Sequence, residues 1–189
     1  MINFLTHTSF RLSRKFFTIL ARIRFKKFGK GSSMLFGRTV VNPKRILVGE
    51  NVCIGEFVWL NADTVVGHEK DKVSLTIGSG SHISRFVHIN AFKNVVIEEN
   101  VLIGANVYLG DTDHITKRKD IPIIKQGLQV KGKVLIKSGS YICKNSIIAA
   151  GITIGKNSIV APGAYVLTDV PDHAMALGNP ATIIENYNK

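Results

Sequence analysis

The sequence predicts an all-β fold in which the chain winds into a parallel coil with three short faces in each turn. Three observations carry this prediction. Aliphatic residues recur at every sixth position over long stretches, glycine often follows them, and an aliphatic or small residue stands two positions before them. Neither the 3.6-residue period of an α-helix nor the two-residue period of a strand produces this spacing. A fixed period of this kind indicates a repeat architecture.

The recurring aliphatic residues define the coil. Each six-residue unit forms one flat face and a corner, and three units complete one turn. The aliphatic side chain points inward and stacks on its equivalent one turn away, while glycine relieves the tight backbone at the corner. The repeat predicts about five turns within residues 34–172. Its positions are Val48, Ile54, Leu60, Val66, Ile77, Ile83, Ile89, Ile97, Ile103, Leu109, Ile136, Ile142, Ile148, Ile154, Val160 and Val166.

The sequence predicts a basic amphipathic helix at residues 9–28, within an N-terminal segment that spans residues 1–33. Apolar and basic residues fall on opposite faces. The apolar face holds Leu12, Phe16, Ile19, Leu20 and Ile23, and the basic face holds Arg11, Lys15, Arg22 and Lys26. Two interpretations stay open: the helix lies on an anionic membrane surface, or it packs on its own domain or on a neighbouring subunit. Residues 29–33 are expected to be a linker.

The positive charge of the chain is concentrated near its start. The 189 residues include 25 Lys and Arg against 13 Asp and Glu, and no acidic residue precedes Glu50. No recognised reading motif accompanies the basic residues, so we expect no nucleic-acid partner. Cys53 and Cys143 lack metal-ligand spacing, and we find neither a signal peptide nor a spanning apolar run. We therefore expect a cytoplasmic protein, at the inner face of the cytoplasmic membrane if the helix binds there.

The regular spacing stops after Leu109. A polar loop at residues 111–130 begins with Asp111, Asp113 and His114 and continues into a short run of basic residues. Long polar excursions from a regular scaffold are usually functional, disordered or accommodated insertions. We interpret this loop as the wall of an active site with His114 as its base, since imidazole is matched to proton transfer near neutral pH. A carboxylate beside the ring would fix its tautomer.

With these residues in view, the chain resembles the hexapeptide-repeat acyltransferases. It is most similar to the sugar O-acetyltransferases of the galactoside/maltose acetyltransferase and O-antigen or capsule type. The resemblance rests on VHINAF, on IEENVLIGANVYLGDTDH, and on ITIGKNSIVAPGAYVLTDVP with the later ALGNPA. Its most specific part is the Asp-x-x-His step at residues 111–114 followed by GNPA after the last coil. The closing segment is expected at residues 173–189.

The resemblance implies a left-handed β-helix and a homotrimer that binds acetyl-CoA and a sugar or glycan acceptor in clefts. The implied function is acetyl-CoA-dependent O-acetyl transfer to a sugar hydroxyl, in surface polysaccharide or lipid-linked glycan biosynthesis. His114 matches the catalytic base and Asp111 its partner aspartate. Asn90 matches an acceptor-facing asparagine, although a corner role stays open for it. His88 and Asp113 are further candidates for acceptor binding.

The resemblance also selects candidate residues for the cofactor: Tyr141, Lys144, Pro162, Thr168 and Thr182. The chain departs from the family pattern here, because Thr168 and Thr182 replace residues that are usually basic. Lys144 or backbone groups are expected to compensate.

Two other functions stay open. One is a non-catalytic β-helix scaffold in which His114 is incidental. The other is hydration of CO₂, which needs three metal-bound imidazoles. The spacing of His82, His88 and His114 does not reproduce such a site, so we expect no metal.

Overall fold

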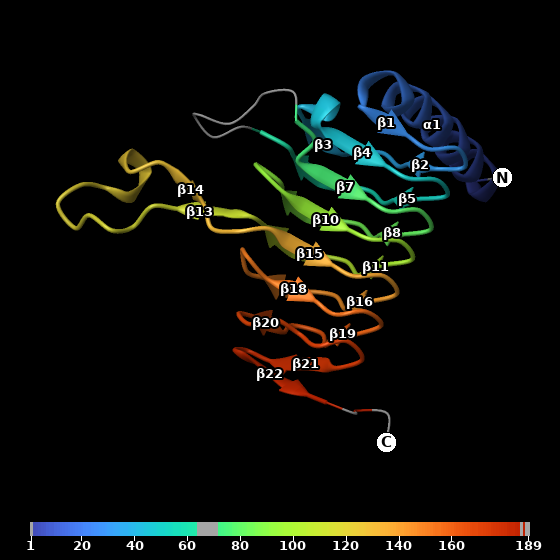
Figure 1. Ribbon diagram of the computed structural model, residues 1–189. Coiled ribbons are helices and arrows are strands. Elements are labelled where there is room, and N and C mark those ends of the chain that lie inside the picture. Colours follow the sequence, from blue (N-terminus) through green and yellow to red (C-terminus); the bar gives the residue numbers. More distant parts are fainter. Residues whose placement is uncertain (1, 64–71, 186, 188–189) are drawn as a thin grey trace.

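Three parallel sheets form the three faces of a left-handed β-helix (Figure 1). The computed structural model describes residues 2–63, 72–185 and 187, with side chains from residue 12 onward. The first sheet contains β1 (Lys27–Phe28), β4 (Ile46–Val48), β7 (Leu75–Ile77), β10 (Val95–Ile97), β15 (Val134–Ile136) and β18 (Thr153–Ile154). The second contains β2 (Ser33–Met34), β5 (Cys53–Ile54), β8 (His82–Ile83), β11 (Leu102–Ile103), β16 (Tyr141–Ile142), β19 (Ile159–Val160), β21 (Met175–Gly178) and β22 (Ala181–Ile184). The third contains β3 (Thr39–Val41), β6 (Trp59–Asn61), β9 (His88–Asn90), β12 (Tyr108–Gly110), β17 (Ile147–Ile148) and β20 (Tyr165–Val166).

The stacked aliphatic residues form the core of the coil. Strand register places Ile97 beside Ile77 and Ile136 in the turns before and after it. Every aliphatic repeat position that the structure describes is fully buried, and Val66 lies outside the described residues. Complete burial of an aliphatic side chain contributes about 1.5–3 kcal/mol, so these stacked aliphatic residues supply the main driving force for folding.

The coil starts at Lys27, seven residues before the expected boundary at residue 34 and one turn before Val48, the first expected repeat position. The first and third sheets each contain six strands, and the additional turn is formed by β1, β2 and β3. Phe28, Met34 and Val40 follow one another at six-residue intervals, and eight positions separate Val40 from Val48. Residues 29–33 are therefore a corner of the coil and not a linker. The buried Ser32 hydroxyl stabilises this corner, because it donates to the Gly49 carbonyl at 2.7 Å and accepts from the Val52 amide at 2.9 Å.

Glycine and asparagine alternate at the corner between the first and second sheets. All of them have positive φ, in the order Gly31, Asn51, Gly80, Asn100, Gly139 and Asn157. A Cβ atom at each of these glycines would overlap the Oδ1 atom of the asparagine in the next turn. The asparagine side chain thus occupies the space that the glycine leaves open, and the corner repeats every two turns.

Helix α1 (Ile2–Arg24) covers the N-terminal end of the coil (Figure 1). It packs through Ala21, which is buried, and through Phe17, whose ring contacts Phe36 at 5.8 Å between centroids. The Thr18 hydroxyl accepts a hydrogen bond from the Met34 amide at 3.2 Å. The helix ends at Arg24, earlier than expected, because the Lys26 amide already bonds to carbonyls of the next turn.

Most of the predicted apolar face of α1 does not pack on the coil. Leu12, Phe16, Ile19 and Ile23 are 63%, 62%, 56% and 75% exposed. The helix therefore packs on its own domain, as one of the two interpretations proposed. It does so through the face that holds Phe17 and Ala21 and not through the predicted apolar face. No helix in the described part of the chain is long and apolar enough to cross a bilayer.

The C-terminal segment closes the other end of the coil. β21 extends the second sheet in parallel beside β19, and β22 then turns back antiparallel to β21. The resulting hairpin ends the parallel stack. Short 3₁₀-helices, η1 (Pro43–Arg45) and η2 (Ile123–Lys125), lie at a corner and in the long excursion.

Candidate active site

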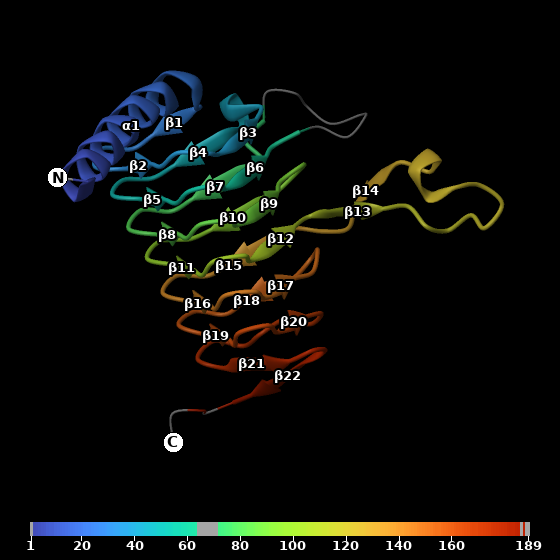
Figure 2. The same cartoon turned by 180° about the vertical axis from the view of Figure 1, so that it is seen from behind.

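The excursion after β12 is an ordered arm, which we define as residues 111–131. It contains an antiparallel hairpin of β13 (Thr112–His114) and β14 (Leu128–Val130), with η2 beyond it. Figure 2 shows it projecting sideways from the coil. The Gln126 side chain bonds to both the amide and the carbonyl of Arg118, at 3.0 and 2.7 Å. The sequence predicted the protrusion but not its internal hairpin.

Asp111 fixes the base of the arm. Its carboxylate is fully buried and accepts hydrogen bonds from three consecutive backbone amides, those of Phe92, Lys93 and Asn94, at 2.9, 2.7 and 2.7 Å. Its carbonyl accepts from the Lys131 amide at 2.9 Å, where the chain returns to the coil. A buried carboxylate needs such partners to offset its desolvation. These contacts give Asp111 a structural role.

The buried guanidinium of Arg45 lies at the same corner. It donates to the carbonyls of Lys72, Ala62 and Phe92 at 2.9, 2.8 and 3.0 Å, and also to the Asp63 carbonyl. Burial lowers the pKa of Arg45, while the charges of Asp63 and Asp111 oppose this effect. The Arg45 side chain thereby links residue 63 to residue 72 through their carbonyls, next to the base of the arm.

His114 lies on β13 and is exposed. Among the described residues, its backbone amide bonds to the Asp113 carboxylate at 2.8 Å, and no hydrogen bond involves its ring. The other Asp113 oxygen pairs with Lys131 Nζ at 2.9 Å. This hydrogen bond to Lys131 is the main reason why the pKa of Asp113 lies below its ordinary value. Neither aspartate holds the imidazole of His114 within this single chain, contrary to the expectation for Asp111.

Outward-facing side chains of the third sheet form a ladder that ends near the base of the arm. The rings of Trp59, His88 and Tyr108 follow one another with centroid distances of 5.4 and 5.3 Å. His88 Nε2 lies 3.2 Å from the Asn90 side-chain oxygen, and Asn90 Nδ2 donates to the Tyr108 hydroxyl at 3.3 Å. The structure thus brings the side chains of His88 and Asn90 together.

Trp59 and Tyr108 were missed by reasoning from the sequence. Both directly precede an inward aliphatic residue, as His88 does. Their shared position in the repeat is the signal that identifies the ladder, since equivalent positions in successive turns lie side by side.

Three of the five cofactor candidates lie on successive turns near the second sheet. Tyr141 is on β16, and Lys144 and Pro162 follow β16 and β19 at the next corner. The Lys144 carbonyl accepts from the Gly163 amide at 3.1 Å, which joins the two corners. Nearby Cys143 raises the pKa of the Tyr141 hydroxyl, and burial raises the pKa of the Cys143 thiol.

Of the other two cofactor candidates, Thr168 lies apart from these three, whereas Thr182 lies in the same sheet, two strands beyond β19. Thr168 follows β20 at the corner from which the arm emerges two turns earlier. Thr182 is on β22, where its hydroxyl donates to the Leu177 carbonyl at 3.2 Å. No cluster of His, Cys, Asp and Glu suited to a metal ion occurs among the described residues.

Residues 133–168 match the family described as bacterial transferase hexapeptide (six repeats). No curated protein sequence matches the chain closely enough to count as a relative.

Solved structures that share the fold include the following three. AntD, an N-acyltransferase from Bacillus cereus crystallised with dTDP and 3-hydroxybutyryl-CoA, is 23% identical over 88% of this chain and 85% of its own, with a TM-score of 0.73. The hexapeptide-repeat acetyltransferase VCA0836 from Vibrio cholerae, with acetyl coenzyme A, is 23% identical over 88% of this chain and 74% of its own, with a TM-score of 0.59. A point mutant of perosamine N-acetyltransferase from Caulobacter crescentus, with CoA and GDP-perosamine, is 21% identical over 84% of this chain and 59% of its own, with a TM-score of 0.60.

At these identities the likeness establishes the fold. Together with the repeat match, it confirms the resemblance of this chain to the hexapeptide-repeat acyltransferases of left-handed β-helix fold.

Proposed function

We propose that this chain is an acetyl-CoA-dependent O-acetyltransferase that modifies a sugar hydroxyl, with His114 as the general base. The observation that carries the proposal is the exposed imidazole of His114, whose ring makes no hydrogen bond among the described residues, on the hairpin at the base of the arm. The carboxylate of Asp111 fixes the point where the arm leaves the coil, because it accepts hydrogen bonds from three backbone amides. A base on a supported strand meets the positional requirement for proton transfer better than one on a free loop.

The chemistry requires one proton acceptor and no covalent enzyme intermediate. The acceptor oxygen attacks the thioester carbonyl while its proton passes to the His114 imidazole. The tetrahedral intermediate then collapses, the carbon–sulfur bond breaks, and the sulfur takes the proton to leave as free CoA thiol. A positioned general base contributes about 10²–10⁴-fold to such a reaction.

The printed ligands of the three similar structures support an acyl-CoA donor and a sugar acceptor, since they include acetyl-CoA, 3-hydroxybutyryl-CoA and GDP-perosamine. Two of those proteins are named as N-acyltransferases. Oxygen as the acceptor atom is therefore our own proposal, made from the Asp-x-x-His and GNPA motifs. We propose surface polysaccharide or lipid-linked glycan biosynthesis as the pathway and the cytoplasm as the compartment.

Tyr141, Lys144 and Pro162 form the proposed contact surface for CoA, because they lie on adjacent turns. Thr182, two strands beyond β19 in the same sheet, and Thr168, at another corner, are further proposed contacts. His88 and Asn90 are proposed to bind the acceptor together with Tyr108. The projecting arm leaves one side of His114 open, which supports a homotrimer in which a neighbouring subunit supplies the facing wall. The resemblance also suggests acceptor contacts from a second loop at residues 67–74, of which positions 67–71 lie outside the described residues.

The test is thiol release from acetyl-CoA with matched panels of neutral sugars, amino sugars and nucleotide-linked sugars. His114→Ala should lower the acceptor-dependent rate about 10²–10⁴-fold, with unchanged thermal unfolding. His82→Ala, which replaces another exposed histidine, is the matched control and should retain the rate.

Three outcomes would change the proposal. A larger loss in His88→Ala than in His114→Ala would move the base to the ladder on the third sheet. Turnover with amino sugars alone would make nitrogen the acceptor atom. Absence of both turnover and acetyl-CoA binding would favour the scaffold function.

A further inference from the structure

The exposed face of α1 carries a four-residue apolar stripe, which we define as Leu12, Phe16, Ile19 and Ile23. These positions follow one another at intervals of four, three and four residues, so they align on one side of the helix. Each side chain is more than half exposed. The opposite side of α1 is already used, since Ala21 is buried against the coil. The stripe is therefore free in the described chain.

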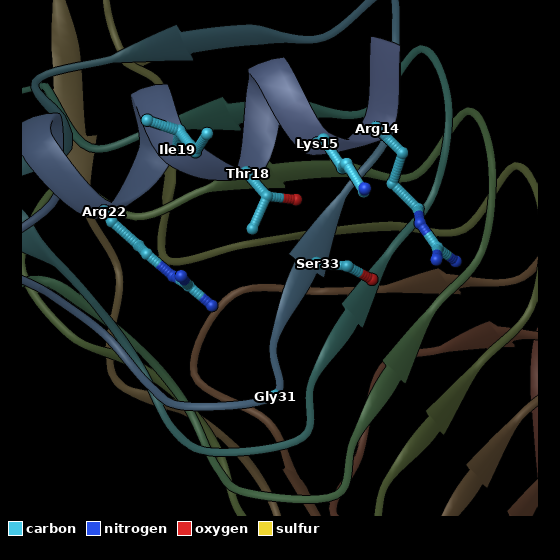
Figure 3. A pocket seen from close by; sticks show the side chains of 7 residues that line it. All are labelled: Arg14, Lys15, Thr18, Ile19, Arg22, Gly31 and Ser33. Atoms are coloured by element: carbon cyan, nitrogen blue, oxygen red, sulfur yellow. The ribbon is translucent and has the colours of Figure 1, made fainter. Parts of the chain in front are cut away.

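A basic cavity borders this stripe. Its volume is about 380 Å³, and it lies between α1 and the corner that leads into β2. Figure 3 shows Arg14, Lys15 and Arg22 extending from the helix toward Ser33 and the neighbouring turn. Ile19, a member of the stripe, lines the same cavity. Three cations and an apolar surface thus meet at one edge of the helix.

The charge around α1 restricts what covers the stripe. Eleven Lys and Arg and no Asp or Glu occur before Glu50. A second copy of α1 would bring this unbalanced positive charge against itself. A nucleic acid would pair with the cations but would leave the apolar stripe in water. An anionic bilayer satisfies both features, because acyl chains cover the stripe while phosphate groups meet the cations.

We propose that α1 docks this protein on an anionic phospholipid bilayer, with the stripe below the headgroups and a lipid phosphate in the cavity of Arg14, Lys15 and Arg22. Figures 1 and 2 place α1 at the N-terminal end of the coil, while the arm projects from the other side. Docking therefore leaves His114 accessible. The proposal stands independently of the transferase activity.

The experiment is co-flotation of the full chain with vesicles of phosphatidylcholine alone and of phosphatidylcholine mixed with phosphatidylglycerol. We expect flotation only with the mixed vesicles and a loss of binding at high salt. Phe16→Ser/Ile23→Ser should weaken the partition coefficient at least about a hundredfold, since two exposed apolar side chains lose their burial. Both residues are exposed, so folding should be preserved, which circular dichroism and thermal unfolding verify.

A second pair of substitutions tests whether the cavity contributes to membrane binding. Lys15→Gln/Arg22→Gln should weaken binding to mixed vesicles about thirtyfold, the effect of two basic side chains near an anionic surface. Lys125→Gln/Lys156→Gln removes the same charge from exposed positions far from α1 and should change binding less than threefold.

Three results would overturn the proposal. The first is absence of flotation with mixed vesicles, even if calorimetry detects binding of inorganic phosphate. The second is equal flotation of the wild-type chain and Phe16→Ser/Ile23→Ser. The third is a fall in solution mass by light scattering for Phe16→Ser/Ile23→Ser, which would assign the stripe to an interface between copies.

Discussion

Asp111 shows how a single carboxylate determines where a functional segment leaves a regular fold. Its side chain binds three amides in one turn while its own backbone binds the returning end of the arm. Phe92 is held from both sides, because its amide donates to Asp111 and its carbonyl accepts from Arg45. Two buried ionic groups of opposite sign therefore organise one corner. Breaking such an arrangement by removing one partner is costly.

We predict that Asp111→Asn destabilises the protein by about 2–4 kcal/mol, because an amide NH₂ would face amide donors that a carboxylate now satisfies. Chemical denaturation measures this loss, and hydrogen exchange should show faster opening of residues 112–131. Asp113→Asn is the control, since the Asp113 side chain is exposed and its ion pair should contribute at most about 1 kcal/mol. Unchanged stability in Asp111→Asn, together with reduced acyl transfer, would restore a direct catalytic role.

Phe57 and Phe86 also stand out at the residue scale. Both adopt positive φ, which bulky side chains rarely do. Their rings stack at 5.2 Å with an interplanar angle of 9°, and Phe57 also contacts Phe36 at 6.0 Å. Stacking between successive turns offsets part of the cost of this backbone conformation.

At the scale of the elements, the alternating corner is the most demanding feature of the coil. Gly80 has φ of 72°, and a Cβ there would meet the Asn100 side chain. Ser81 in the glycine-bearing turn donates to the Glu98 carbonyl at 2.9 Å and accepts from Val101 at 3.1 Å. Turns with glycine and turns with asparagine are therefore not interchangeable.

We predict that Gly80→Asn destabilises the protein by about 2–3 kcal/mol through overlap with Asn100. Gly163→Asn is the matched control: Gly163 has a similar φ of 71° and nothing near an added Cβ, so it should cost less than about 1 kcal/mol. The double variant Gly80→Asn/Asn100→Gly should recover most of the lost stability. Equal effects of the two single variants would mean that backbone conformation alone, and not contact between turns, sets the cost.

The molecule as a whole is a stack with both ends covered. α1 covers the first turn, and the hairpin of β21 and β22 ends the last one. An uncovered end of a parallel stack presents unpaired strands that can join another chain.

We predict that removing residues 1–26 leaves a folded coil that associates into larger particles than the full chain, because the first turn becomes an open edge. Light scattering measures the association, and circular dichroism tests whether the coil persists. Phe16→Ser/Ile23→Ser, which keeps the cover in place, should not show this association. A shortened chain with no increase in association would mean that the first turn protects its own edge.

The sequence predicted the coil well because its signal is repeated. Many buried positions report the same six-residue period, so errors at single sites have little effect. It missed the first turn, because the eight-residue interval between Val40 and Val48 interrupts the six-residue period. It also predicted an apolar face of α1 but not which face would pack. That choice depends on the shape of the first turn, into which Ala21 fits.

The candidate site could be predicted less completely. The Asp-x-x-His step located the arm, but spacing alone could not separate a carboxylate that orients an imidazole from one that binds Phe92, Lys93 and Asn94. The hairpin of the arm lies outside the repeat, so periodicity carried no information about it. The ladder of Trp59, His88 and Tyr108 depends on register between turns, which emerges only once the coil is aligned.

The two-turn alternation of glycine and asparagine also limits how such a protein can change length. Removing a single turn would set glycine above glycine or asparagine above asparagine at that point, and one residue would lose its complementary partner in the neighbouring turn. Removing two turns would preserve the pairing. The repeating unit of this corner is therefore a pair of turns, which comprises six of the six-residue units that the sequence period suggests.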